Sequence, residues 1–312
     1  MNIKLICHLM VWELEHFLLV ADKLKQSSYF INEEDTIYFD ICLNLSEGIY
    51  DWDNSKLPKE YFIEKYNNCI KLLENKFIIN SKIYEGSEVY GHLDLQKESI
   101  QKNIDYYVII CPDISFNEYT LYLLIESAKQ IENKYFIITP QIFKSWDSSW
   151  DSLVNDKFNH IPYSECINHD IHWIHHESRN LSDESLEKYD EFKYAGWFDL
   201  FSKETYEVLF KIPEDWSGYG PWDFFTMRIA YFAKQQGVDI QQYVLKNNII
   251  WFYDVGSLKD PDKFGTDGVL KEGVKKFLTL KIDRGKQRQN IEDRFQQDLQ
   301  NWIEYAKLNK II

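Results

Sequence analysis

Asp113 stands directly after the most apolar stretch of the sequence, in the run Cys-Pro-Asp-Ile-Ser-Phe at 111–116. Residues 106–111 read Tyr-Tyr-Val-Ile-Ile-Cys, which predicts a buried strand. Ligands of open α/β sheets bind beyond the carboxyl ends of such strands. A carboxylate there can hold Mg²⁺ or Mn²⁺ that bridges phosphates. The alternative is that Asp113 is a turn or capping residue before a helix.

A second carboxylate, Asp223, follows a turn rich in glycine and proline. Gly218, Gly220 and Pro221 predict a tight turn, and a helix is expected to begin at Trp222. From the first turn of that helix, Asp223 could take the proton of an acceptor hydroxyl. The alternative is that it only stabilises the helix dipole.

Histidines are concentrated in residues 169–177, His-Asp-Ile-His-Trp-Ile-His-His-Glu. A spacing of three on a helix would bring His169, His172 and His175 or His176 to one face, where they could bind zinc. The stretch contains no His-Glu-x-x-His, and its Ile and Trp residues favour ordinary polar or core histidines instead.

Asp94 and Lys97 lie just after a glycine turn, in the run Tyr-Gly-His-Leu-Asp-Leu-Gln-Lys at 90–97. Near the start of a short helix, such residues could contact a base and a diphosphate. A surface lysine is the simpler interpretation of Lys97. The sequence has no Walker pattern and no Gly-x-Gly-x-x-Gly, which gives little support to triphosphate hydrolysis or dinucleotide redox chemistry.

Strand and helix patterns alternate over the first 140 residues, which predicts a mostly parallel sheet with helices on both faces. Strands are expected at 3–7, 36–45, 77–84, 106–111 and 135–139, and helices at 12–25, 59–75, 92–103 and 117–131. Farther along, strands are expected at 197–201 and 244–253, helices at 203–209, 222–236 and 274–308, loops at 146–170 and 260–268, and an exposed acidic excursion at 178–189.

The composition excludes several classes of protein. A net charge of −15 over 312 residues argues against binding to a nucleic-acid backbone. Hydrophobic residues at 45% and charged residues at 27% are typical of a globular protein with a core. Five cysteines without CxxC spacing indicate a reducing compartment. Since no apolar run reaches the roughly 18 residues of a membrane span, we expect a cytoplasmic protein.

Aromatic residues make up 16% of the chain. Indole rings can stack on sugars, although filling a core is the simpler role for most of them.

The order of these segments resembles that of GT-A fold glycosyltransferases, which use nucleotide sugars. It runs from Gly-x-x-Asp-x-x-Lys at 91–97, through a strand ending in Pro-Asp-Ile-Ser-Phe and another ending in Ile-Thr-Pro, to Gly-Trp-Phe-Asp-Leu-Phe-Ser-Lys and Tyr-Gly-Pro-Trp-Asp-Phe-Phe. The resemblance implies an α/β fold with a Rossmann-like, mostly parallel central sheet flanked by helices. It implies a domain over 1–258, with a nucleotide-sugar half at 1–140 and an acceptor half at 141–258, followed by a helical extension at 259–312.

The resemblance also implies a metal site. The family's Asp-x-Asp motif matches Cys111, Pro112 and Asp113, so Asp113 would bind the Mn²⁺ or Mg²⁺ that holds the donor diphosphate. Cys111 stands where the family has its first carboxylate. Asp254 is the nearest substitute for the histidine that family members often supply late in the fold.

The implied activity is an inverting, hexosyl-type transfer from a UDP- or GDP-sugar to a hydroxyl of a glycan or glycolipid, with Asp223 as general base. Donor contacts are expected from Asp40, Asn44, Asp94, Lys97 and Asp113, and acceptor contacts from Trp197, Tyr219, Gly220 and Trp222.

Two other classes stay open at this point. One is a metallohydrolase built on the histidines of 169–176, which stoichiometric zinc would favour. The other is a carbohydrate-binding protein that keeps the sheet without the chemistry, since Cys111 replaces a carboxylate. The locally basic stretch 275–288 leaves three roles open for the last segment: packing on the domain, dimerisation, or peripheral contact with a membrane.

Overall fold

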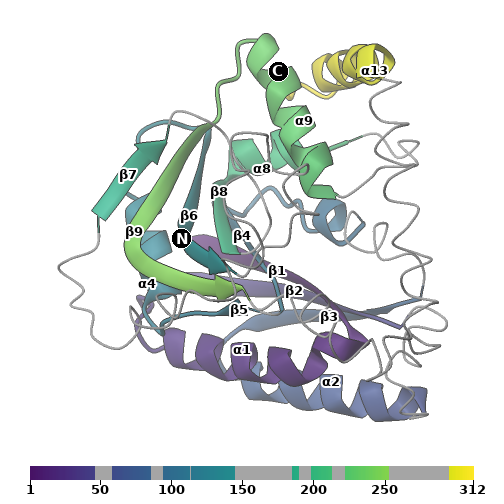
Figure 1. Cartoon of the computed structure of the whole chain (residues 1–312), viewed down its shortest axis with the longest axis vertical. Helices are drawn as coiled ribbons and strands as arrows, with labels where there is room; N and C mark the ends of the chain where they lie inside the picture. The colour runs from purple at the N-terminus through teal and green to yellow at the C-terminus, as the bar shows by residue number, and fades with distance from the viewer. Residues whose placement is uncertain are drawn as a thin grey trace, which may run out of the picture.

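A single sheet organises the protein. The computed structural model describes residues 1–45, 58–85, 94–112, 114–144, 185–189, 198–212, 222–252 and 295–312. In these ranges the strands follow the order β3-β2-β1-β4-β8-β6-β9-β5, and β7 pairs with β9 (Figure 1). The strands are β1 (Asn2–Met10), β2 (Thr36–Asn44), β3 (Ile78–Tyr84), β4 (Tyr106–Ile110), β5 (Ile114–Ser115), β6 (Phe136–Lys144), β7 (Ser185–Tyr189), β8 (Phe198–Ser202) and β9 (Gln241–Phe252).

Helices cover both faces of this sheet. They are the 3₁₀ helix η1 (Val11–Glu13) and the α-helices α1 (Leu14–Ser27), α2 (Lys59–Leu73), α4 (Thr120–Ala128), α8 (Lys203–Phe210), α9 (Trp222–Gln235) and α13 (Phe295–Leu308). Residues 94–98 add one short helical turn. Figure 1 shows α1 and α2 side by side on one side of the sheet and α8, α9 and α13 on the other.

Most strands run in one direction. β1 pairs in parallel with β2 and β4, β2 with β3, and β6 with β9. β8 is antiparallel to β4 and β6, and β5 and β7 are antiparallel to β9. Of the nine strands in the described ranges, six therefore point the same way and three the opposite way. The predicted α/β class with a mostly parallel, helix-flanked sheet is confirmed.

The predicted elements agree with the structure except at a few places. The expected acidic excursion at 178–189 contains the strand β7, which pairs with β9. Charged residues are common on edge strands because they discourage further pairing, and the exposed Lys188 fits that role. The helix expected at 92–103 is described only as a turn at 94–98, and the two-residue strand β5 was not predicted. The predictions for 146–170, 169–177 and 260–268, and the part of the predicted helix at 274–294, lie outside the described residues.

Each face of the sheet has its own core. The first face carries the odd-numbered side chains of β1 and β2, such as Leu5 and Phe39, which pack with buried residues of α1, α2 and α4. The second face carries the even-numbered ones, such as Ile6 and Cys42, together with residues of α8, α9 and α13. Because β1 is covered on both sides, every residue from Ile3 to Met10 is buried, and the strand is apolar almost throughout.

The helix α13 completes the second face. Trp302 and Ala306 are fully buried there, and the Trp302 ring lies 6.3 Å from the Phe232 ring of α9. Of the three roles left open for the last segment, packing on the domain is the one observed for 295–312.

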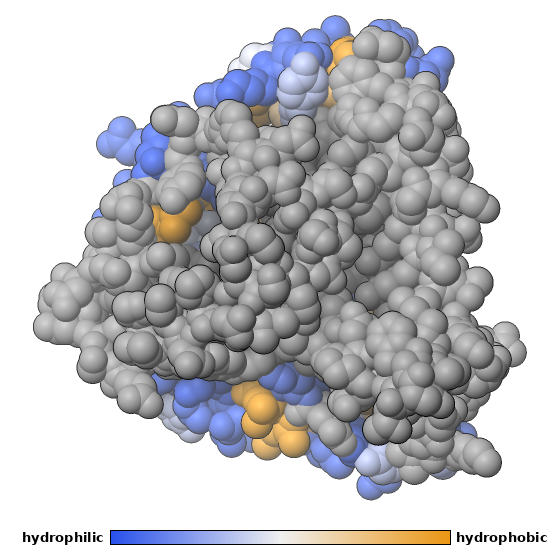
Figure 2. Space-filling model, in the orientation of Figure 1, coloured by the Kyte–Doolittle hydropathy of each residue, from blue (hydrophilic) through white to orange (hydrophobic). Residues whose placement is uncertain are grey.

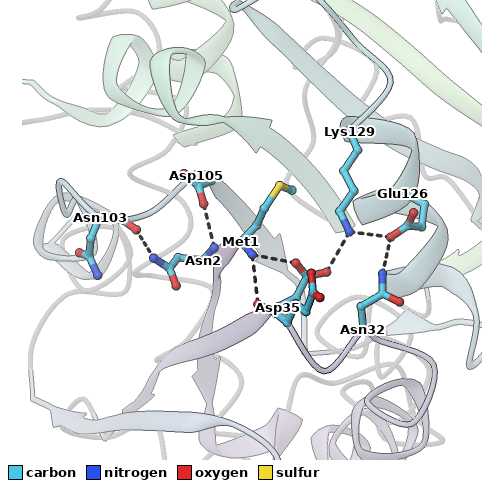
Figure 3. Close-up of polar contacts among 9 residues, drawn as sticks. Met1, Asn2, Asn32, Asp35, Asn103, Asp105, Glu126 and Lys129 are labelled. Atoms are coloured by element: carbon cyan, nitrogen blue, oxygen red, sulfur yellow. Dashed lines mark hydrogen bonds and ion pairs between the residues drawn. The ribbon is translucent and has the colours of Figure 1, made fainter.

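Charged and polar groups contact one another around the amino end of β1 (Figure 3). The Met1 amine lies 2.8 Å from Oδ1 of Asp35, and the Lys129 ammonium lies 2.9 Å from Oδ2 of the same carboxylate. The Asn2 amide N–H donates to Asp105 at 2.8 Å. These contacts tie β1 to the segments that precede β2, β4 and β6.

The described residues that can be seen in Figure 2 are mostly hydrophilic, with a few small hydrophobic patches among them. Leu18 and Leu19 of α1 are among the exposed large hydrophobic residues, at 44% and 65% exposure. No helix in the ranges that the structure describes is both long and apolar enough to cross a membrane.

Candidate functional site

The carboxyl ends of β1, β2 and β4 lie at one edge of the sheet, because these strands are parallel neighbours. Asn44 is the last residue of β2, and β4 ends three positions before residue 113. Asp113 and Asp254, the two predicted metal ligands, lie outside the described residues. Their described neighbours are paired, since Ile114 of β5 stands opposite Phe252 of β9.

Asn44 is fully buried on the second face. Its Nδ2 atom lies 3.4 Å from Nε2 of His8, which is itself only 4% exposed. The two residues occupy neighbouring strands near the carboxyl edge. This contact joins β1 to β2 on the second face, and a direct contact between Asn44 and the donor stays a prediction.

Asp40 has three partners among the residues that the structure describes. The Lys4 ammonium lies 3.0 Å from its Oδ2, the Ser99 hydroxyl lies 2.7 Å from the same oxygen, and Asn80 Nδ2 lies 3.3 Å from Oδ1. Lys4 is 1% exposed and Asp40 4%. Charges buried this deeply are stable only when paired. The sequence analysis did not single out Lys4, although a lysine inside an apolar strand was a visible signal.

The predicted donor residues Asp94 and Lys97 lie on the short helical turn 94–98, where Asp94 is exposed and Lys97 half-buried. The Tyr206 hydroxyl of α8 donates to the Gln96 carbonyl at 3.0 Å. The sequence analysis missed Tyr206, because it contacts this turn from a distant part of the chain.

His16 of α1 reaches the segment that follows Asp113. Its Nε2 atom lies 3.2 Å from the Ile114 carbonyl oxygen. Since a carbonyl oxygen can only accept, Nε2 must carry the proton. Burial lowers the pKa of His16 by more than this hydrogen bond raises it. The lowered pKa favours the neutral ring, with its one proton on Nε2. His16 was not predicted, and only the fold brings it to this position.

The acceptor side of the predicted site is less fully described. Asp223 and Trp222 belong to the first turn of α9, as predicted, but their side chains are outside the description, as are Trp197, Tyr219 and Gly220 entirely. Whether Asp113 and Asp223 share one cleft therefore stays a prediction. Among the described residues, no group of three or more metal-binding side chains is present.

Solved structures similar to this chain include complexes with nucleotide sugars. S. aureus TarS 1-349 in complex with UDP-GlcNAc is 11% identical, with 98% of this chain and 80% of that chain covered and a TM-score of 0.44. Glucosyl-3-phosphoglycerate synthase from Mycobacterium tuberculosis, in complex with Mn²⁺, UDP-glucose and phosphoglyceric acid, is 8% identical, with 80% and 71% covered and a TM-score of 0.43. A mycobacterial protein is 8% identical, with 84% and 71% covered and a TM-score of 0.45.

No family model and no curated protein sequence matches the chain.

Proposed function

We propose that the protein is a metal-assisted glycosyltransferase that moves a hexosyl group from a nucleotide sugar to a hydroxyl of a glycan or glycolipid. The proposal places donor binding in residues 1–140, acceptor binding and catalysis in 141–258, and a helical extension in 259–312. The free buried cysteines Cys7, Cys42 and Cys69 suit action in a reducing compartment such as the cytoplasm.

The pairing of β5 with β9 is the observation that carries this proposal. Ile114 is paired with Phe252, and consecutive Cα atoms lie about 3.8 Å apart. Asp113 is one residue from Ile114, and Asp254 is two residues from Phe252. Chain connectivity therefore limits the distance between these two carboxylates, which lie 141 positions apart in sequence (254 − 113), and this supports the proposal that they share one divalent cation.

Asp113 and Asp254 would hold Mn²⁺ or Mg²⁺, since carboxylate oxygens are the ligands these hard cations prefer. When bound, the cation would neutralise charge on the leaving diphosphate. Lys97 would add a second positive charge near that diphosphate. Asn44 and Asp94 would complete the donor contacts, and Asp40, whose buried carboxylate binds Lys4 and Ser99, would support them without touching the donor.

The reaction itself is a displacement at the anomeric carbon. The acceptor oxygen forms a bond to that carbon while the bond to the diphosphate oxygen breaks, and the diphosphate leaves with the electron pair. Asp223 takes the acceptor's proton while the acceptor oxygen attacks from the face opposite the leaving group. Attack from that face inverts the configuration of the anomeric carbon. Trp197, Tyr219, Gly220 and Trp222 would seat the acceptor.

The test begins with wild-type protein, UDP-GlcNAc, UDP-glucose and a GDP-sugar, each with and without Mn²⁺. Binding of a donor should raise the melting temperature in the presence of metal, because a ligand that binds only the folded state stabilises it. Asp113→Asn should abolish the metal-dependent part of that rise. Unchanged Mn²⁺ dependence in this variant would remove Asp113 from the site.

Asp223→Asn separates binding from transfer. Loss of a general base lowers kcat by roughly 10²- to 10⁴-fold. The thermal shift with donor should stay as in wild type, because Asp223 acts on the acceptor. A variant that no longer binds donor would contradict the assigned role, and stoichiometric zinc in purified wild-type protein would favour a metallohydrolase instead.

A further inference from the structure

Residues 94–101, which include Asp94 and Lys97, are held on the second face by side chains from three separate elements. Asp40 comes from β2, Tyr107 from β4 and Tyr206 from α8. We propose that these three side chains are positioning residues, which fix this segment in one place so that it can receive the donor. The inference rests on the proposed function, because the donor contacts themselves belong to that proposal.

The contact with β2 runs through Ser99. Its hydroxyl oxygen lies 2.7 Å from Oδ2 of Asp40 and 2.7 Å from the Leu95 carbonyl oxygen, so that one proton is shared between two acceptors. Ser99 is fully buried. The Asp40 carboxylate also binds Lys4 and Asn80, so it holds Ser99 from within the core of the second face.

The contact with β4 is a pair of hydrogen bonds. The Tyr107 hydroxyl accepts from the Gln101 amide N–H at 2.8 Å and donates to the Gln101 carbonyl oxygen at 3.0 Å. Burial raises the pKa of Tyr107 to about 12, against a smaller opposing effect of the Gln101 bond. The hydroxyl therefore keeps its proton at neutral pH and can make both bonds.

The contact with α8 is supported by ring stacking. The Tyr206 ring stacks on the Tyr107 ring with centroids 4.0 Å apart and planes 12° apart. Burial raises the pKa of Tyr206, so its hydroxyl remains a donor to the Gln96 carbonyl oxygen at 3.0 Å. The two tyrosines form one rigid unit that binds the segment at both ends.

What this anchoring achieves is preorganisation. A short helical turn of five residues is unstable by itself, because helix nucleation is unfavourable. Without its anchors, the segment would have to be ordered each time a donor bound, and that cost would weaken binding. With the three side chains in place, residues 94–101 lose their conformational entropy when the protein folds and not when the donor binds.

Tyr206→Phe tests the proposal with the smallest possible change, since it removes only the hydroxyl and keeps the stacked ring. Tyr66→Phe is the matched control. Tyr66 is 1% exposed on the first face, and its hydroxyl also donates to a backbone carbonyl, that of Ile41, at 2.9 Å. Both variants lose one buried hydrogen bond of the same type, so both should lose a similar amount of stability.

The donor KM separates the two variants. Tyr206→Phe should raise it about fivefold to tenfold, the size of one lost hydrogen bond, and change kcat by less than about twofold. Tyr66→Phe should leave KM and kcat as in wild type. Hydrogen exchange of the amides of 94–101 should accelerate in Tyr206→Phe only. Equal KM changes in both variants, or faster exchange with an unchanged KM, would overturn the positioning role.

Failure of the proposed function would look different. Wild-type protein that neither binds nor uses any nucleotide sugar would reject that function and, with it, a role in receiving the donor. In that event the exchange measurement would still report whether the three side chains anchor the segment.

Discussion

The two faces of the sheet are built from the same strands but differ in chemistry. In β1, Leu5 and its neighbours on the first face are apolar, while Lys4 and His8 on the second face are buried and polar. Asp40 of β2 and Asp199 of β8 are also buried on the second face, since Cys42 and Phe201, two residues after each of them, belong to that core. Among the described strand residues, the buried Lys, His and Asp side chains thus lie on one face of the sheet.

This difference teaches where sequence is constrained by more than packing. Many combinations of apolar residues of suitable volume can fill the first face. On the second face, each buried polar group needs a partner of the right type at the right place. The second face is also the one that holds residues 94–101, so the demanding chemistry and the proposed donor segment coincide.

The largest expected effect comes from breaking the Lys4–Asp40 pair. Lys4→Met fills the same space but leaves the Asp40 carboxylate buried without its cation, which should cost about 4 kcal/mol of unfolding free energy. Urea unfolding followed by circular dichroism measures it. Lys4→Met combined with Asp40→Leu should recover most of the loss, because no buried charge is left. A double variant as unstable as the single one would show that the pair's charge is not the cause.

Leu5→Ala provides the comparison on the opposite face of the same strand. Its cost, about 3 kcal/mol, should come from lost packing and the cavity left behind. Removing a buried charge elsewhere, as Asp40→Leu does for Lys4→Met, should not restore the stability that Leu5→Ala loses. The pair of measurements therefore separates the two faces by mechanism as well as by size.

A smaller effect is expected from Asp35, which lies at the amino edge and belongs to neither face. Burial acts to raise its pKa, but hydrogen bonds from the Met1 amine and Lys129 outweigh it, so the pKa is lowered. A lowered pKa contributes stability above the unfolded-state value, and this is lost as the pH falls through the folded-state value. Asp35→Asn should therefore cost up to about 1 kcal/mol at pH 7 and much less at pH 3.

Melting temperatures of wild type and Asp35→Asn across this pH range check the prediction. Glu126→Gln is a useful control, since Glu126 contacts Lys129 without touching Asp35. If the melting temperatures of wild type and Asp35→Asn fell by the same amount as the pH was lowered, Asp35 would not be the group that titrates.

The smallest expected effect is an absence of difference between two thiols. Burial raises the pKa of Cys42, on the second face, and of Cys69, in the core of the first, to about 11 in each case. Since the thiolate is the reactive form, neither should be alkylated in the native protein at pH 8, and both should be alkylated in denaturant. Peptide mapping by mass spectrometry distinguishes them. Faster native labelling of Cys42 would mean that the polar face opens to water.

The sequence predicted the elements better than their connections. The strands β1, β2 and β4 are buried apolar runs, and α2 places buried residues at helical spacing, so local pattern sufficed. The antiparallel direction of β8 was not predicted, because a strand's composition does not encode its direction. β7 was missed because the polar residues of an edge strand resemble those of a loop.

The candidate site was predictable only as far as single segments. Asp94 and Lys97 were singled out because they follow a glycine turn, Asn44 was singled out by the resemblance, and the role of each stays a prediction. The Lys4–Asp40 pair joins residues 36 positions apart, and Tyr206 contacts Gln96 across 110 positions. No local pattern reports such contacts, since they depend on strand order.

The two coverings of the sheet also differ in when the ribosome makes them. The helices of the first face come from residues 14–128, whereas α8, α9 and α13 of the second come from residues 203–308. Because chains fold from the N-terminus as they are synthesised, the second face stays open to water for longer. We expect Lys4, His8 and Asp40 to reduce aggregation of the incomplete chain, because hydrated polar and charged side chains on the uncovered face make it less apolar. Nascent chains arrested near residue 190 should accordingly stay dispersed, and replacing Lys4 and Asp40 by apolar residues should make them sediment.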